Sequence, residues 1–382
     1  MSKRTTNRQI AKSRPKTGKE CLTPAILRLL LGGAALTGTT LWALAPRSRQ
    51  ERQRQNAANM PDVFYAHRGL HDAGSGLTKE YQETDGDYIE LARRMARKAG
   101  YGMGPENDDR PIAPENSLAA FAAACEAGYG IELDLQLTAD NRVVVVHDPD
   151  LLRVAGCPQR VADLTYDQLR HIPLFPNPSV YGDAKAEPLS QAELEAEKIM
   201  PLPQQSQYQH VPLFSDVLKV VDGRVPIIVE YKFEGNSWGD RQRLLMKSGD
   251  KLLRDYDGAY VVESFNPMAM RWYRQNHPEV FRGQLAVSTP FPIDRNTDLQ
   301  TNLHSLQRGI IPWIAGKLGF NWLSRPDFVA YHWAGGRSPQ MCLTRALGAL
   351  PVAWTLRSAG ELDRCRNDFD RFIFEAFVPP ED

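Results

Sequence analysis

From residue 62 onward, short apolar runs alternate with longer segments that have a helical pattern of apolar and polar positions. The apolar runs predict strands at 63–66, 131–135, 143–146, 227–229, 260–262, 282–285, 328–331, 352–354 and 372–374. The helical pattern falls between several of them, at 117–127, 215–221, 241–256, 267–276 and 339–347. This alternation predicts βα units and a largely parallel sheet, and hence an α/β fold. The length allows two to three domains or one α/β barrel of about 250 residues or more.

If the fold is a barrel, at least one of the nine candidate strands lies outside it, because such a barrel has eight. The sequence does not say which. The run of four valines at 143–146 has no polar alternation, as expected for a strand covered on both faces. Three long connections with Pro and Gly, at 71–112, 172–210 and 287–325, are expected to be insertions over one mouth of the barrel.

The N-terminal part of the chain has a different pattern. Seventeen residues without a charge, LLLGGAALTGTTLWALA, occupy 29–45, which is the lower edge of the roughly 17 to 25 residues that span a bilayer. We expect a basic tail at 1–24, a single transmembrane helix at 25–45 and a linker at 46–61, before one domain at 62–382. Two alternatives stay open: a cleaved signal peptide, since Ala43-Leu44-Ala45 has the small-x-small form of a cleavage site, and a helix buried in the domain.

Charge supports this division. The chain has 46 basic and 46 acidic residues, but residues 1–54 have a net charge of +10 and the remainder −10. A basic segment of this kind suits an anionic membrane surface. The zero net charge of the whole chain gives no support for nucleic-acid binding. Basic residues stand on both sides of the apolar run, with a small excess before it. The positive-inside rule therefore favours an exported domain only by a small margin, and the side of the membrane on which the domain lies stays open. Five cysteines without C-x-x-C spacing argue against a disulfide framework and a structural zinc site.

Ionisable residues stand where the first four predicted strands end. They are His67 and Arg68 after the first strand, Glu132 and Asp134 on the second, His147 after the third, and Glu230 and Lys232 at the fourth. The carboxylates of Glu132 and Asp134 share one face of their strand, because alternate residues point the same way. The C-terminal ends of parallel barrel strands meet on one face, so we expect all these side chains to converge there.

The residue types predict a chemistry. Three crowded carboxylates, Glu132, Asp134 and Glu230, would repel one another without a cation, and oxygen ligands favour Mg²⁺ or Ca²⁺. Two histidines beside such a metal could act as general acid and general base. Arg68 and Lys232 suit a phosphate, which predicts a site that cleaves phosphodiesters. Taken singly, each of these short motifs more often has a structural role. A His-Arg-Gly motif is usually a turn, a Glu-x-Asp pair is usually a solvated strand face, and a Glu-x-Lys pair is usually a surface ion pair. The remaining histidines, which lack a strand-end context, are expected to be surface or core residues: His71, His171, His210, His277, His304 and His332.

Three stretches carry a resemblance to a known family. They are YAHRGLHD at 65–72, APENSLAAFAAACEAGYGIELDLQLTADNRVVVVHDPDLLRV at 113–154 and VPLFSDVLKVVDGRVPIIVEYK at 211–232. The chain resembles the glycerophosphodiester phosphodiesterase family over most of 62–382. The resemblance implies a (β/α)₈ TIM barrel that hydrolyses glycerophosphodiesters to glycerol 3-phosphate and an alcohol.

The resemblance also implies residue roles. His67 and His147 would be the acid/base pair, with Glu132, Asp134 and Glu230 as ligands of one divalent cation. The phosphate contacts would be Arg68 and Lys232, with Glu115 as a supporting carboxylate. In this family the glycerol 2-hydroxyl is thought to attack phosphorus and give a cyclic phosphate, which water then opens. On that scheme the histidines exchange roles between the two steps.

Some features depart from the family pattern or are ambiguous. Pro-Glu-Asn occurs at both 105–107 and 114–116, and only the second leads into a capped helix, so we assign the motif to Glu115. The last strand ends in Phe-Glu-Ala where the family usually has Ile-Thr-Asp, so Glu375 is not assigned a role. Trp354 either walls the substrate pocket or packs in the barrel core.

Two other functions compete with the leading one. A lysophospholipase D-type enzyme acting on membrane lysolipids would need an apolar channel to the site, which the sequence does not reveal. A barrel that only binds phosphorylated ligands would lack an acid/base or metal residue, and all of these residues are present.

Overall fold

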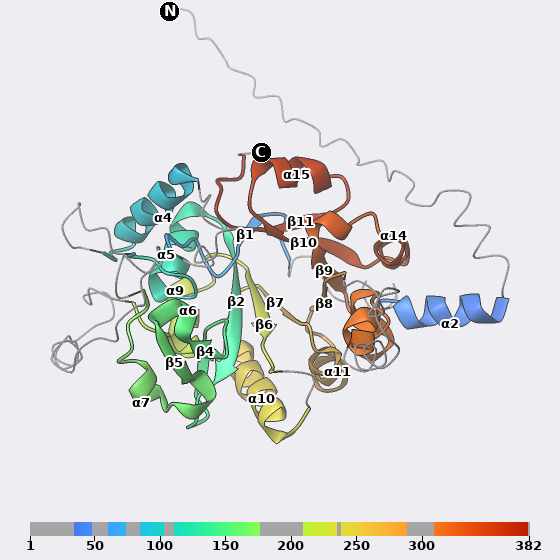
Figure 1. The fold of residues 1–382 in the computed structure, drawn as a ribbon, viewed down its shortest axis with the longest axis horizontal. Coiled ribbons are helices and arrows are strands. Elements are labelled where there is room, and N and C mark those ends of the chain that lie inside the picture. Colours follow the sequence, from blue (N-terminus) through green and yellow to red (C-terminus); the bar gives the residue numbers. More distant parts are fainter. Residues whose placement is uncertain are drawn as a thin grey trace, which may run out of the picture.

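The computed structural model describes residues 34–47, 60–73, 85–102, 111–175, 209–234, 238–288 and 309–380. Eight parallel strands form a closed barrel in the order β1-β11-β10-β9-β8-β7-β6-β2, and pairing of β1 with β2 closes it (Figure 1). The strands are β1 (Phe64–Ala66), β2 (Gly130–Leu137), β6 (Ile227–Tyr231), β7 (Tyr260–Ser264), β8 (Arg282–Ala286), β9 (Phe328–His332), β10 (Leu350–Leu356) and β11 (Arg371–Phe374). The expected TIM barrel is confirmed.

One of the nine candidate strands, β3 (Val143–Val145), lies outside the barrel and runs antiparallel to β2. The expectation that its end joins the mouth as a parallel strand end is therefore wrong. β2 is long enough to pair with three strands: its start pairs with β1, Ile131–Leu135 pair with β6, and Leu135–Leu137 pair with β3. The chain turns back after β2, so β3 returns towards the mouth. The four valines at 143–146 are buried, as their uninterrupted apolar pattern predicts.

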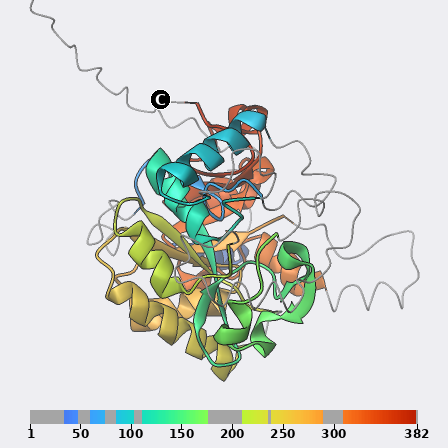
Figure 2. The same cartoon turned by 90° about the vertical axis from the view of Figure 1, so that its left-hand side faces the viewer.

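Helices surround the barrel (Figures 1 and 2). Five were predicted within one or two residues: α5 (Leu118–Ala127), α9 (Phe214–Val221), α10 (Asp240–Arg254), α11 (Pro267–Asn276) and α14 (Pro339–Ala346). Two shorter ones, α13 (Asn321–Ser324) and α15 (Ala359–Cys365), precede β9 and β11. Ser117 caps α5 by accepting a hydrogen bond from the backbone N–H of Ala120.

The helix α4 (Gly86–Lys98) was not predicted. It lies in the described part of the 71–112 connection and packs against α5. Asp85 caps it, and the apolar side that it buries consists of Tyr88, Ala92 and Ala96. The 71–112 connection, expected to be an insertion over the mouth, therefore contains a helix that packs on α5. Most of the 172–210 connection and the first part of the 287–325 connection lie outside the described residues.

The barrel interior is filled below the mouth by side chains from its strands, including Tyr65, Ile228 and Phe328. Close packing explains Gly130 on β2. A Cβ at this position would lie 2.6 Å from the ring of Tyr65, its neighbour in register on β1. Along β6, Ile228 belongs to this interior cluster and Glu230 follows two residues later on the same face. The strand pattern therefore puts apolar side chains in the core and carboxylates at its upper end.

A small subdomain is inserted between β2 and α9. It consists of β3, β4 (Asp150–Leu151), α6 (Leu152–Ala155), β5 (Cys157–Arg160), the 3₁₀ helix η4 (Val161–Asp163) and α7 (Tyr166–Leu169). The subdomain has its own apolar cluster, built around Val144, Leu151 and Phe175. Since β3 is hydrogen-bonded to β2, the subdomain is fixed at the rim of the barrel.

The N-terminal helix α2 (Ala34–Leu44) projects from one side of the domain in Figure 1. Residues 25–33 of the expected transmembrane helix and 48–59 of the expected linker lie outside the described residues. Among the helices of the described ranges, none combines the length and apolar character needed to cross a bilayer.

Candidate active site

Three buried carboxylates meet at the C-terminal end of the barrel strands. Glu132 and Asp134 lie on β2, and Glu230 lies on the neighbouring β6, directly beside Asp134 in the register. One oxygen from each carboxylate lies within 4.8 Å of the others, and all three residues are buried. The grouping predicted from the sequence is therefore present.

Burial and mutual repulsion act strongly on these groups. Burial, followed by the charges of Asp134 and Glu230, raises the pKa of Glu132 well above its usual value. Burial likewise raises the pKa of Glu230. Burial would also raise the pKa of Asp134, but the charges of Lys232 and His147 outweigh it and hold this pKa below its usual range. Glu132 and Glu230 are thus disfavoured as anions by burial and by their carboxylate neighbours.

The donor set fits a divalent cation. The buried Oδ1 atom of Asp134 accepts no hydrogen bond, although Nζ of Lys232 lies 3.3 Å away. Lys232 donates instead to Oε2 of Glu230, at 2.8 Å. The three carboxylates, one of which has an oxygen that accepts no hydrogen bond, offer only oxygen ligands. Such a ligand set suits Mg²⁺ or Ca²⁺ better than zinc.

His67 follows β1 and is held by Glu375, which follows β11. Nδ1 of His67 lies 2.6 Å from Oε2 of Glu375, and Nε2 lies 3.8 Å from Oε2 of Glu132. The other oxygen of Glu375 lies 2.6 Å from Nε of Arg357. Burial lowers the pKa of His67 to about 4, although the charge of Glu375 acts in the opposite direction. The ring is thus oriented with Nε2 towards the carboxylates.

His147 reaches the mouth on the returning hairpin rather than on a barrel strand. The backbone N–H of Val146 donates to the carbonyl of Asp134, which places the next residue beside the carboxylates. Nδ1 of His147 lies 2.6 Å from Oδ1 of Asp148. The side-chain amide of Gln136 donates to the carbonyls of Val146, His147 and Asp148, at 2.8–3.0 Å. Gln136 therefore fixes the backbone that carries His147.

Arg68 and Glu115 form a buried ion pair. Nη1 of Arg68 lies 2.9 Å from Oε1 of Glu115, and its Nε lies 3.4 Å from Asp134. Arg153 of the subdomain contacts the same Glu115 at 2.6 Å and Asp148 at 2.5 Å. Burial alone would raise the pKa of Glu115, but the two guanidinium groups outweigh it and lower this pKa. Glu115 thus links the barrel to the subdomain that carries His147.

Asn116 also belongs to the site. Its φ of 56° lies in the left-handed region, which asparagine tolerates better than most residues. In this conformation its Nδ2 donates to Oδ2 of Asp134 at 2.9 Å. The 114–116 motif thus provides two site residues, Glu115 and Asn116, whereas the motif at 105–107 lies in the part of the chain that is not described.

Sequence reasoning missed several residues around the two histidines: Glu375, Asp148, Arg153, Asn116, Gln136 and His71. His71, expected to be a surface or core residue, is buried with Nε2 3.8 Å from Glu375. Three signals were available. Asp148 directly follows His147, Gln136 continues the i, i+2 series after Asp134, and Glu375 ends a strand. Arg153 carried no local signal, because its partner Glu115 is 38 residues away.

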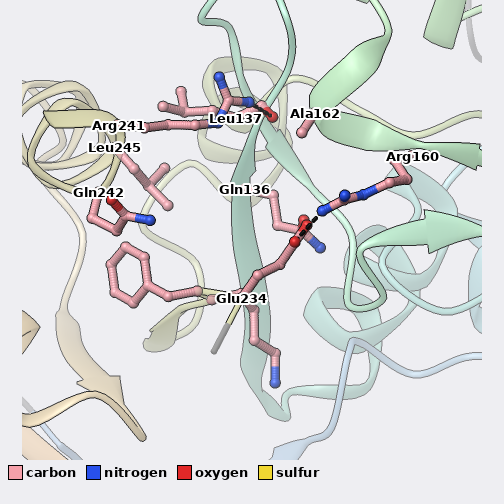
Figure 3. A pocket seen from close by; sticks show the side chains of 10 residues that line it. Gln136, Leu137, Arg160, Ala162, Glu234, Arg241, Gln242 and Leu245 are labelled. Atoms are coloured by element: carbon pink, nitrogen blue, oxygen red, sulfur yellow. Dashed lines mark hydrogen bonds and ion pairs between the residues drawn. The ribbon is translucent and has the colours of Figure 1, made fainter. Parts of the chain in front are cut away.

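Two further features lie next to Lys232. Trp354 on β10 contacts Phe265 edge-to-face, with ring centroids 5.5 Å apart, and Nζ of Lys232 lies 5.9 Å from the centroid of the Phe265 ring. A cavity of about 240 Å³ lies at the rim between the start of α10 and the subdomain (Figure 3). Lys232 is one of its lining residues, and an ion pair between Arg160 and Glu234 lies across it.

Comparison with known proteins agrees with this geometry. Residues 107–305, 199 of 382, match the glycerophosphoryl diester phosphodiesterase family. A glycerophosphodiester phosphodiesterase of Bacillus altitudinis is 47% identical over 58 residues, 15% of this chain and 24% of that protein. Glycerophosphodiester phosphodiesterase 1 of Bos taurus is 44% identical over 61 residues, 16% of this chain and 18% of that protein. The matched segment thus spans about a quarter or less of these relatives.

The fold has a solved counterpart. It is the structure of an Oleispira antarctica phosphodiesterase in complex with the product sn-glycerol-3-phosphate. The alignment covers 85% of this chain and 94% of that chain, with a TM-score of 0.50 and 17% sequence identity. At that identity the similarity supports the shared fold. With a family match over more than half of its residues, this chain belongs to the glycerophosphoryl diester phosphodiesterase family.

Proposed function

We propose that this chain is a metal-dependent phosphodiesterase that hydrolyses glycerophosphodiesters to glycerol 3-phosphate and an alcohol. The proposal rests on one observation. The carboxylates Glu132, Asp134 and Glu230 lie at one mouth of the barrel together with two histidines, each of which has its Nδ1 against another carboxylate. Family membership supports the same activity.

The two histidines are equipped for proton transfer. In each ring Nδ1 faces a carboxylate, which favours the tautomer with a proton on Nδ1 and a lone pair on Nε2. One histidine would take the proton of the glycerol 2-hydroxyl through Nε2 as its oxygen attacks phosphorus. The other, protonated, would give its proton to the departing alcohol. In the second step water opens the cyclic phosphate, and the histidines exchange roles.

The charged residues around them would bind the phosphate. Glu132, Asp134 and Glu230 would hold Mg²⁺ or Ca²⁺, which when bound supplies Lewis-acid stabilisation of negative charge on the phosphoryl group. Lys232 would turn from Glu230 and Asp134 towards phosphate oxygens once a cation balances those carboxylates. Arg68, which Glu115 orients, would form the second phosphate contact.

A product assay tests the proposal. Purified protein is incubated with glycerophosphocholine and Mg²⁺ or Ca²⁺, and glycerol 3-phosphate is measured against a sample treated with EDTA. We expect metal-dependent release of glycerol 3-phosphate. Absence of that product with every glycerophosphodiester tested and with both metals would contradict the function.

The lysophospholipase D alternative has one observation in its favour. Phe265, which is 40% exposed, and Trp354 form an apolar wall next to Lys232. Such a wall could border an acyl chain as well as a small alcohol. The same assay with a lysophospholipid separates the two, because faster release of a lipid phosphate or cyclic phosphate than of glycerol 3-phosphate would favour the alternative.

We also propose that the N-terminal segment attaches the enzyme to a membrane. The support is the uncharged run at 29–45 and the +10 net charge of residues 1–54. Fractionation of the full chain tests it. Protein that stays in the membrane pellet after a high-salt and carbonate wash supports the anchor, and a soluble protein shortened near residue 45 would instead indicate a cleaved signal peptide.

A further inference from the structure

The helix α2 has an unusual exposure for its composition. Its eleven residues, Ala34–Leu44, carry no charge. Leu44 at its end is buried against the domain, but Gly38, Thr39 and Thr40 are exposed and Trp42 is 53% exposed. A helix that is hydrophobic all round is buried in a protein core or lies in lipid. The described part of the domain leaves this end of α2 partly uncovered, and Trp42 is the large apolar side chain that it exposes.

The last turn of α2 is bound tightly to α13. The indole of Trp42 stacks on that of Trp322, with centroids 5.4 Å apart and planes at 24°. The guanidinium of Arg325 lies 5.1 Å from the centroid of the Trp42 ring. The same group donates 2.8 Å hydrogen bonds to the carbonyls of Trp42 and Ala45. Stacking and hydrogen bonds together fix the direction in which α2 leaves the domain.

The chain just after α2 is fixed as well. Nδ2 of Asn321 donates to the carbonyl of Leu44 at 3.2 Å. Arg47 and Asp327, both buried, form an ion pair at 3.3 Å, and the backbone N–H of Arg47 donates to Pro326. The start of the segment expected to be a linker is thus packed into the domain, which fixes how α2 joins it.

The side chains at this junction resemble those of a membrane interface. Trp322 is 37% exposed beside the more exposed Trp42, and Arg274 donates to the carbonyl of Trp322. Tryptophan and arginine together are typical of the boundary between lipid and water, where the indole lies among headgroups and the guanidinium pairs with phosphate. Upstream, the uncharged run starts at Leu29 and is preceded by basic residues.

We infer that the junction face, formed by Trp42, Trp322, Arg274 and Arg325, lies against an anionic lipid bilayer, with α2 directed into the lipid. This rests on the membrane attachment proposed above and adds to it a fixed contact surface on the barrel. The domain would be held at the bilayer in one orientation by the stacked indoles, rather than on a loose tether.

Fluorescence quenching by brominated lipid tests the inference. Full-length protein is reconstituted in vesicles of phosphatidylcholine and phosphatidylglycerol, with and without brominated acyl chains. The variants are W42F, W322F and the control W238F, whose indole packs against Phe233 near the start of α10. We expect W42F and W322F each to lose part of the quenching of the wild-type protein, and W238F to lose none.

Two results would overturn the inference. One is quenching of W42F and W322F equal to that of the wild type. The other is full-length protein that does not bind the vesicles but forms dimers in which Trp42 and Trp322 become protected from aqueous iodide, since the covering would then be a second copy. Hydrolysis of soluble glycerophosphocholine by W42F and W322F in detergent separates this test from that of the proposed function. It should equal that of the wild type.

Discussion

Nδ1 of His67 lies 2.6 Å from Oε2 of Glu375, which joins the end of the first barrel strand to the end of the last. Arg357 holds the other oxygen of this carboxylate at 2.6 Å. The pair keeps a proton on Nδ1 and leaves Nε2 available on the side of Glu132. Glu375 is therefore placed to position the ring of His67 through Nδ1.

Replacing Glu375 with Gln should lower kcat for glycerophosphocholine by roughly 10²- to 10⁴-fold, the range for loss of a correctly oriented acid/base histidine. The amide can donate to Nδ1 and so favours the wrong tautomer. KM should change little, and Glu375→Asp should recover part of kcat because it keeps the carboxylate. The control is Glu279→Gln, which also removes a carboxylate next to a histidine but away from the site. Wild-type kcat in E375Q would contradict the positioning role.

Replacing His67 or His147 with Ala should each lower hydrolysis by roughly 10²- to 10⁴-fold, because each change removes one proton carrier. Steady-state rates on glycerophosphocholine measure the effect, and circular dichroism checks that the fold is intact. His171→Ala, in the subdomain but without a contact to the carboxylates, should retain full activity. Near wild-type rates in either H67A or H147A would rule out the assigned role.

Removal of metal should abolish turnover, and Glu230→Gln should weaken metal binding, because one of three anionic ligands becomes neutral. Calorimetric titration with Mg²⁺ and Ca²⁺ measures the affinity. In the wild-type protein, metal at about 100 times its Kd should add roughly 2.7 kcal/mol to the free energy of unfolding. Asp216→Asn on the exposed side of α9 is the control. Full activity after exhaustive EDTA treatment would refute the metal site.

Replacing Arg153 with Ala should reduce the free energy of unfolding by roughly 1.5–3 kcal/mol, since Glu115 and Asp148 lose charged hydrogen bonds. Urea unfolding measures the change, and a double-mutant cycle with Glu115→Gln isolates the pair. Arg337→Ala removes an exposed ion pair with Asp368 and should cost about 0–1 kcal/mol. Equal losses in R153A and R337A would show that the buried network contributes little.

Replacing Gly130 with Ala should destabilise the barrel by roughly 1–3 kcal/mol, because the added methyl group overlaps the ring of Tyr65. The measurement is the midpoint of thermal or urea unfolding. Gly86→Ala, at a helix start where no atom lies within 4 Å of the new Cβ, should be neutral or slightly stabilising. A stable G130A would mean that Tyr65 can move without cost.

The sequence alone determined the repeating strands and helices, because these depend on local periodicity. It also placed Glu132, Asp134 and Glu230 together, since residues at i and i+2 share a strand face and parallel strands end at one mouth. His67 was placed by the same rule. Each of these inferences needs only the order of residues along one strand and the general geometry of a barrel.

Tertiary structure decided what depends on contacts between distant segments. Val143–Val146 has the composition of a barrel strand, and only pairing with the end of β2 makes it an antiparallel hairpin that brings His147 back to the mouth. Glu375 lies 308 residues from His67, and their contact exists because β11 pairs with β1 when the barrel closes. The Glu375–His67 contact and the docking of α2 on α13 join segments that have no local relation, so no pattern along the chain predicts them.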